Sequence, residues 1–173
     1  MMGSKYVAII ISVLLICLVG IVMPVANNAE SKVKEWFDAK AYPYLYIEQS
    51  QETKAAAFKD VAQRPDFLVY AGKHGVIAVD SKNKPFNTDF KSFAVSESDI
   101  SLLSGFHNLF GFPVWLVFYA HGSGSTYHWM SLDDVKNFEV RTGKQEKGGA
   151  FRAVPMKFCK EIKTSDDISK LFL

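Results

Sequence analysis

The sequence predicts an α+β protein in which an N-terminal membrane-spanning helix is followed by a helix-entered antiparallel sheet. Two observations carry this prediction. Residues 6–26 carry no formal charge over 21 positions, and a membrane-spanning helix needs about 20 apolar residues. Beyond residue 66 the hydrophobic pattern becomes typical of β-strands. The chain is therefore expected to comprise a cytoplasmic tail (1–5), a signal-anchor (6–26), juxtamembrane helices (27–65) and an extracytoplasmic α+β domain (66–173).

The N-terminal segment favours a retained anchor over a cleaved signal. Its apolar run from Tyr6 to Met23 is longer than the core of about 7–15 residues typical of cleaved signals, and the small residues Ala26 and Ala29 make poor cleavage sites. A short tail with Lys5 favours a cytoplasmic N-terminus. We therefore expect a single-pass protein of the cell (inner) membrane with its C-terminal domain outside the cytoplasm. A cleaved signal, or a second span at 101–120, is the alternative.

Two helices are expected next. Asn27 and Glu30 have the spacing of a capping box, and Val33, Trp36 and Phe37 recur on one helical face. A second helix is expected over about 44–63. Arg64-Pro65 would end it, because the residue before a proline disfavours helical geometry.

The remaining segments are expected to form a sheet with short helices between its strands. Phe67–Ala71 and Val76–Asp80 predict a hairpin followed by a turn at 81–85. Phe112–Ala120 is uncharged and almost wholly apolar, which favours a central strand covered on both faces. The other expected elements are a helix capped by Ser96 and Asp99, a half-exposed strand at 126–130, a helix capped by Ser131 and Asp134, strands at 138–142 and 150–158, and a helix at 164–173. Pro155 suggests an edge strand or a bulge.

This order of elements resembles two families. Helices leading into a hairpin, a strong strand and further strands resemble a PAS or Cache-type sensory domain, which implies an antiparallel sheet with helices on one side. Alternatively, the strand at 112–120 with its following turn, and Arg152 to Pro155, resemble parts of the thioredoxin fold. The redox dithiol of that family would fall at 123–126, where no cysteine stands, so this resemblance implies a redox-dead protein.

Signals of catalysis are weak. The four histidines lack the short spacing of metal ligands, and Cys17 and Cys159 cannot pair if one lies in a membrane. Ser123 and Ser125 lie in G-S-G-S-T, not in the G-x-S-x-G pattern of a hydrolase nucleophile. Neither a cofactor nor a metal is expected.

Charge is uneven although the whole chain carries only +2. From 136 to 163 eight basic residues stand against three glutamates. This stretch predicts either solvated loops or a basic face for lipid headgroups or an acidic partner.

The expected function is a non-enzymatic, membrane-anchored module that recognises a partner protein or a small ligand. The bilayer would be contacted through residues 6–26, a protein partner or a second copy would bind outside, and nucleic acid is not expected. The alternatives are a membrane-active effector of the phage holin kind and a thioredoxin-like accessory protein. The candidate binding residues are aromatic and polar side chains around one turn and basic side chains near the C-terminus, namely Tyr119, His121, Tyr127, Trp129, Arg141, Lys144, Lys147 and Arg152.

Overall fold

The computed structural model describes residues 29–83, 91–119, 125–143 and 149–173. The expected tail and signal-anchor, residues 1–26, lie outside this part of the chain. Within the described ranges, no helix combines the length and the apolar character that crossing a membrane requires.

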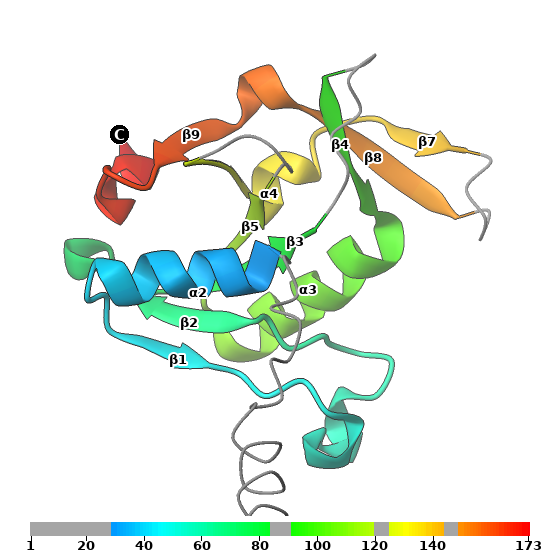
Figure 1. Ribbon diagram of the computed structural model, residues 1–173. Coiled ribbons are helices and arrows are strands. Elements are labelled where there is room, and N and C mark those ends of the chain that lie inside the picture. The colour runs from blue at the N-terminus through cyan, green and yellow to red at the C-terminus, as the bar shows by residue number, and fades with distance from the viewer. Residues whose placement is uncertain (1–28, 84–90, 120–124, 144–148) are drawn as a thin grey trace, which may run out of the picture.

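The main sheet has six strands in the order β1-β2-β3-β5-β6-β9 (Figure 1). Its neighbouring strands run antiparallel except for β3 and β5, which are parallel. A parallel pair needs a crossover connection, and here α3 (Glu97–Phe110) lies in that connection. The strands are β1 (Tyr44–Tyr46), β2 (Phe67–Tyr70), β3 (Val76–Lys82), β5 (Val114–Phe118), β6 (Thr126–Ser131) and β9 (Lys160–Lys163).

A second sheet has three antiparallel strands in the order β4-β8-β7. They are β4 (Ser92–Ser96), β8 (Ala150–Pro155) and β7 (Val140–Thr142), and Figure 1 shows them extending to one side of the main sheet. Pro155 stands at the end of the middle strand and faces Ser92. The expected edge strand or bulge at this proline is therefore wrong. Because Pro155 ends its strand, its missing N–H does not interrupt the ladder.

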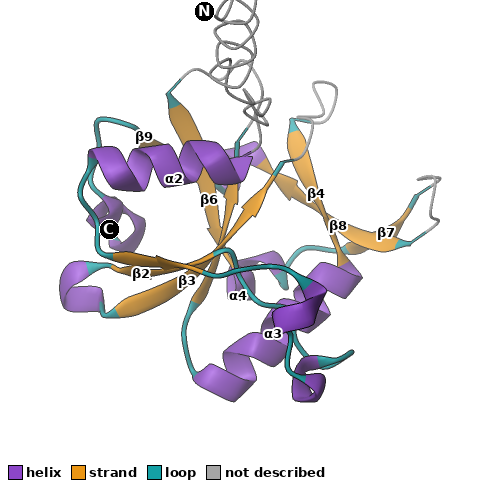
Figure 2. Ribbon diagram, turned by 60° about the horizontal axis from the view of Figure 1, so that its bottom comes forward, coloured by secondary structure: helices purple, strands orange, loops and turns teal. Residues whose placement is uncertain are grey.

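Two hydrophobic cores lie on opposite faces of the main sheet. The helix α2 (Ala29–Ala39) buries Val33, Trp36 and Phe37 on one face, and α3 lies against the other (Figure 2). Alternation along β3 divides its side chains, so that Ile77 joins the α2 core and Ala78 joins the α3 core. The sheet is therefore a covered middle layer.

Several predicted elements are confirmed. The hairpin is β2–β3, and every residue of β5 is buried, as expected for a strand covered on both faces. Ser96 and Ser131 cap α3 and the short helix α4 (Leu132–Val135), each accepting a hydrogen bond from the backbone N–H three residues on. The alternative second span at 101–120 is excluded, because α3 ends at Phe110, its C-cap Gly111 has a left-handed φ of 73°, and a strand follows.

Other expectations for individual elements are wrong. The helix at 44–63 is replaced by β1 and two short 3-10 turns (Gln51–Thr53 and Ala56–Phe58), because residues 44–46 pair with the edge of β2. Strand β6 is buried on both faces rather than half-exposed, since α2 covers Trp129 while Phe93 of β4 lies beside His128. The strand expected at 150–158 ends at Pro155 as β8, and a 3-10 turn (Met156–Phe158) takes its last three residues before β9 begins. Single 3-10 turns also occur at Gly72–His74 and Ile168–Phe172.

The PAS/Cache-like fold class is wrong. That class implies an antiparallel sheet with helices on one side, whereas this sheet contains a parallel central pair and carries helices on both faces. The thioredoxin-like alternative is wrong as well. Residues 152–155 belong to the second sheet, so they do not lie beside β5 in the main sheet as the alternative requires.

Candidate active site

Two charged residues lie on a buried face at the end of the central strand β3. Asp80 and Lys82 are two positions apart, so both side chains point to the α3 side of the sheet. Asp80 is 2% exposed and Lys82 is 8% exposed. Charged residues are rarely buried to this degree unless they are paired or bind a ligand. This end of β3 is therefore the first place to look for function.

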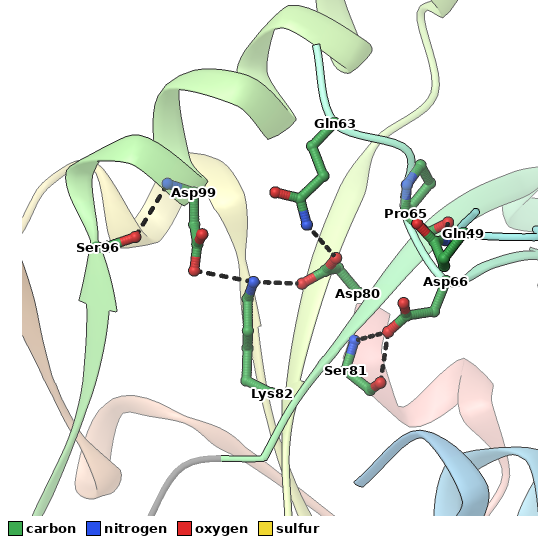
Figure 3. A network of polar contacts seen from close by, with 9 residues as sticks. All are labelled: Gln49, Gln63, Pro65, Asp66, Asp80, Ser81, Lys82, Ser96 and Asp99. Atoms are coloured by element: carbon green, nitrogen blue, oxygen red, sulfur yellow. Dashed lines mark hydrogen bonds and ion pairs between the residues drawn. The ribbon is translucent and has the colours of Figure 1, made fainter. Parts of the chain in front are cut away.

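A second carboxylate comes from the neighbouring strand. Asp66 immediately precedes β2, one position beyond the pair formed by Phe67 and Val79. Its Oδ2 accepts hydrogen bonds from the backbone N–H of Ser81 at 2.7 Å and from the Ser81 hydroxyl (Figure 3). The hairpin β2–β3 thus brings the two carboxylates, 14 positions apart in the sequence, to the same end of the sheet.

Lys82 lies between two carboxylates. Its Nζ is 2.8 Å from Asp80 Oδ2 and 3.0 Å from Asp99 Oδ2. Asp99 belongs to the first turn of α3, where its backbone N–H donates to the Ser96 hydroxyl. Figure 3 shows Asp99 and Asp80 on opposite sides of the ammonium group. We call Asp66, Asp80, Lys82 and Asp99 the acid–lysine cluster.

Two glutamines support the cluster. Gln63 Nε2 donates to Asp80 Oδ1 over 3.4 Å, a long hydrogen bond. Gln49 Nε2 donates to the backbone carbonyls of Ile47 and Pro65, both at 3.0 Å. Because Pro65 precedes Asp66, this second amide fixes the backbone from which that carboxylate projects.

The electrostatics of the cluster disfavour two ionised carboxylates. Burial, and next the negative charge of Asp80, raise the pKa of Asp66 to about 7. Burial also raises the pKa of Asp80, although the Lys82 ammonium opposes this shift. Burial disfavours the charge of Lys82, but Asp80 and Asp99 outweigh it and hold its pKa above the usual value. Lys82 is therefore charged at neutral pH, whereas ionising Asp66 and Asp80 in the folded protein costs free energy.

Glu30 adds a further negative charge. It lies in the first turn of α2, where the Tyr46 hydroxyl donates to its Oε1 at 2.5 Å. Its charge contributes to the raised pKa of Asp66 and of Asp80. Lys82 contacts the carboxylates of Asp80 and Asp99, and Asp66 and Glu30 add further negative charge close to this site. When all of these groups are ionised, the site carries an excess of negative charge that a cation would offset.

The donor set fits a hard divalent cation. Oδ2 of Asp80 is buried and has the Lys82 ammonium 2.8 Å away, and Asp80 Oδ1 accepts only the long hydrogen bond from Gln63 among the described residues, so this carboxylate can still bind a cation. Nowhere in the described ranges do three or more His, Cys, Asp or Glu side chains converge closely enough to hold a metal by themselves. Mg²⁺ is commonly held by only one or two carboxylates, with water and substrate phosphates completing its coordination. Asp66 and Asp80 fit this role.

Those candidate binding residues named from the sequence that the structure describes do not form one group. His121, Lys144 and Lys147 lie outside the described residues. Tyr127 and Trp129 are buried in the α2 core, where the Tyr127 hydroxyl donates to the Lys32 carbonyl. Tyr119 is half-buried, with its ring centroid 5.8 Å from that of Tyr127. Arg152 pairs with Glu97 at 2.6 Å, and Arg141 is exposed on β7. A binding role for these residues stays a prediction.

The sequence contains a signal for the acid–lysine cluster, but each residue also fits an ordinary local feature. Asp80 ends an expected strand, Lys82 lies in the expected turn at 81–85, Asp66 follows the proline expected to end a helix, and Asp99 and Glu30 have the spacing of capping boxes. The usable pattern is the sequence Asp80-Ser81-Lys82 after an apolar strand, because it places two charges on one strand face. A further acid at the start of the paired strand then completes the pattern.

Comparison with known proteins gives likeness in fold alone. The chain matches no protein-family model and no curated protein sequence. Among solved structures it is similar to Hjc from Archaeoglobus fulgidus, a Holliday junction resolvase from an archaeal hyperthermophile, with a TM-score of 0.48 and 11% identity over 82% of this chain and 88% of that chain. It is also similar to D212, a nuclease from a fusselovirus, with a TM-score of 0.46 and 13% identity over 81% of this chain and 80% of that chain.

These findings correct the expected function. The two similar structures are described as a Holliday junction resolvase and as a nuclease, which stands against the expected non-enzymatic binding module, its protein partner and the expected absence of nucleic acid. The holin-type and thioredoxin-like alternatives are corrected with it. The expected bilayer contact and inner-membrane placement are not carried forward: no helix within the described ranges could span a membrane, and residues 6–26, on which both expectations depended, lie outside those ranges.

Proposed function

We propose that this protein is a divalent-cation-dependent nuclease that hydrolyses phosphodiester bonds of nucleic acid. One observation carries the proposal: Asp66 and Asp80 are brought together by the hairpin β2–β3, and Lys82 lies on the same face of β3. The similar structures are described as a Holliday junction resolvase and as a nuclease, but their TM-scores lie below 0.5, so the proposal depends on the cluster.

The cluster has groups suited to each part of such a reaction. Asp66 and Asp80 would hold the cation, which when bound polarises a phosphate oxygen and activates water. The Lys82 ammonium is a compact positive charge that suits a phosphate oxygen as charge develops on it. Hydrolysis forms a bond from a water oxygen to phosphorus and breaks the bond to one ester oxygen. That oxygen leaves with a proton that comes ultimately from the water.

Burial of the cluster supports this role over a purely structural ion pair. A structural pair is most stable when its charges balance, whereas here the carboxylates outnumber the neighbouring lysine and the pKa of Asp66 is raised to about 7. Titratable groups perturbed in this way are concentrated at functional sites.

The test is cleavage of a circular plasmid by the purified full chain with Mg²⁺ or Mn²⁺, and with EDTA as the metal-free control. We expect nicking or linearisation that needs the cation. Asp80→Asn and Lys82→Met should each lower the rate by roughly 10²–10³-fold, the range seen when one electrostatic contact to a transition state is removed. Asp133→Asn is the matched control, because Asp133 is exposed on α4 and pairs with Lys136; its rate should stay at the wild-type level.

Two results would contradict the proposal. One is absence of cleavage by the folded wild-type chain with either cation. The other is cleavage that persists at the same rate in Asp80→Asn, which would assign it to a contaminant.

A further inference from the structure

Asp80 has two competing partners. Its Oδ2 is 2.8 Å from Lys82 Nζ, and the proposed cation would bind the same carboxylate. A divalent cation and an ammonium group repel each other, and both are attracted to Asp80. Unless another group holds Lys82, a cation at Asp80 would displace the lysine from the position where it could meet a phosphate.

Asp99 lies where such a group is needed. Its Oδ2 is 3.0 Å from Lys82 Nζ, on the side of the ammonium away from Asp80. Its side chain is 27% exposed, and the N-cap bond between its N–H and the Ser96 hydroxyl (3.0 Å) fixes its backbone. The carboxylate is thus held by the first turn of a 14-residue helix and needs no rearrangement to retain the lysine.

A second helix in this chain shows what a carboxylate at this position does without a lysine. Asp134 follows the N-cap Ser131 by three residues, as Asp99 follows Ser96. The Ser131 hydroxyl donates to Asp134 Oδ2 at 2.7 Å, so this carboxylate completes the cap of α4. Asp99 instead directs an oxygen to Lys82. The comparison separates the helix-capping role, common to both positions, from the contact specific to Asp99.

We propose that Asp99 is a positioning residue of the active site, which holds the Lys82 ammonium in place while Asp80 binds the divalent cation. This inference rests on the proposed function and adds to it the residue that allows cation and lysine to share one carboxylate. Asp99 touches neither cation nor substrate and acts through Lys82.

The test measures cation binding and kinetics in matched variants. Mn²⁺ affinity of the full chain is measured by titration calorimetry for wild type, Asp99→Asn and Asp134→Asn. We expect Asp99→Asn to weaken Mn²⁺ binding and lower kcat by roughly 10–100-fold, the range for residues that orient metal ligands. KM for the nucleic acid should change by less than about twofold, because Asp99 does not contact it. Asp134→Asn should match wild type in all three quantities.

A shape-matched pair and a double variant complete the test. Asp99→Glu keeps the carboxylate and should regain most of the Mn²⁺ affinity, whereas Asp99→Gln, of the same shape, should not. This pair replaces Asp99→Asn if that variant does not fold. In a Lys82→Met background, Asp99→Asn should lose most of its effect on Mn²⁺ affinity, because its effect runs through the lysine.

The outcomes separate this inference from the proposed function. If wild type binds Mn²⁺ and cleaves the plasmid while Asp99→Asn behaves like Asp134→Asn, the positioning role is refuted and the nuclease proposal stands. An equal effect of Asp99→Asn with and without Lys82 would also refute it, since Asp99 would then act as a general negative charge. If wild type neither binds Mn²⁺ nor cleaves, both proposals are refuted.

Discussion

Replacing Asp66 by asparagine should make the metal-free protein less sensitive to alkaline pH. Burial and the charge of Asp80 raise the pKa of Asp66 from 3.8 to about 7. A carboxyl group whose pKa is raised on folding stabilises the folded state below the unfolded pKa, and this stability is lost as the pH rises through the folded pKa. Asparagine has no proton to lose, and its amide oxygen can still accept the Ser81 N–H.

The size of the effect follows from the shift. One pKa unit corresponds to about 1.36 kcal/mol, so ionising Asp66 in the fold costs about 4 kcal/mol in total. At pH 5 part of this cost is already present, because the unfolded chain is mostly ionised there. Between pH 5 and pH 8.5 the free energy of unfolding of wild type should therefore fall by about 3 kcal/mol more than that of Asp66→Asn.

Urea denaturation in EDTA at the two pH values measures this difference. Other titrating groups are common to both proteins, and Asp133→Asn serves as the control, because its exposed carboxylate should leave the pH dependence unchanged. Mg²⁺ at about 100 times its dissociation constant should return about 2.7 kcal/mol to wild type at pH 8.5, and much less to Asp66→Asn. Equal pH dependence of the wild type and the variant in EDTA would refute the reasoning.

Two further predictions concern the scaffold. Gly105→Ala should destabilise the fold by about 1–3 kcal/mol, because a Cβ there would come within 1.9 Å of the Val61 carbonyl oxygen, whereas Gly149→Ala meets nothing within 4 Å and should be nearly neutral; equal thermal unfolding midpoints would contradict this. His128 is buried with neither ring nitrogen hydrogen-bonded to a described residue, and burial lowers its pKa against the opposing charge of Glu161. Its contribution to stability is present above pH 6.5 and is lost as the pH falls below that value. His128→Phe should therefore lose less stability than wild type between pH 7 and pH 5 in urea titrations, and an unchanged slope would contradict this.

Local patterns were read correctly where a short segment carries its own information. The β2–β3 hairpin, the capping serines of α3 and α4, and the fully buried strand β5 depend on neighbouring residues and on an uninterrupted apolar run. The helix predicted over 44–63 is wrong because pairing with the edge of β2 decides the structure at its start, and that edge lies some 20 residues further along the chain. Intrinsic helix preference is too weak to resist such pairing.

The acid–lysine cluster could not be predicted from the sequence for a different reason. Each of its residues has an ordinary local explanation: Asp99 is the capping partner of Ser96, Asp80 ends an expected strand, and Lys82 lies in an expected turn. Their chemistry arises from proximity, and proximity between Lys82 and Asp99 depends on β4 and the start of α3, which return the chain to the end of β3. The burial that raises the pKa of Asp66 likewise depends on the surrounding layers.

The amino-acid sequence by itself determined the periodicity, the caps and the hairpin, because these follow from steric and hydrogen-bonding preferences that act over a few residues. Only the tertiary structure decided that β3 and β5 run parallel, that helices cover both faces of the sheet, and that Asp80 and Asp99 meet Lys82 at the end of its central strand. The physical reason is that Coulomb interaction and desolvation depend on distance and burial in space, and the order of residues along the chain specifies neither.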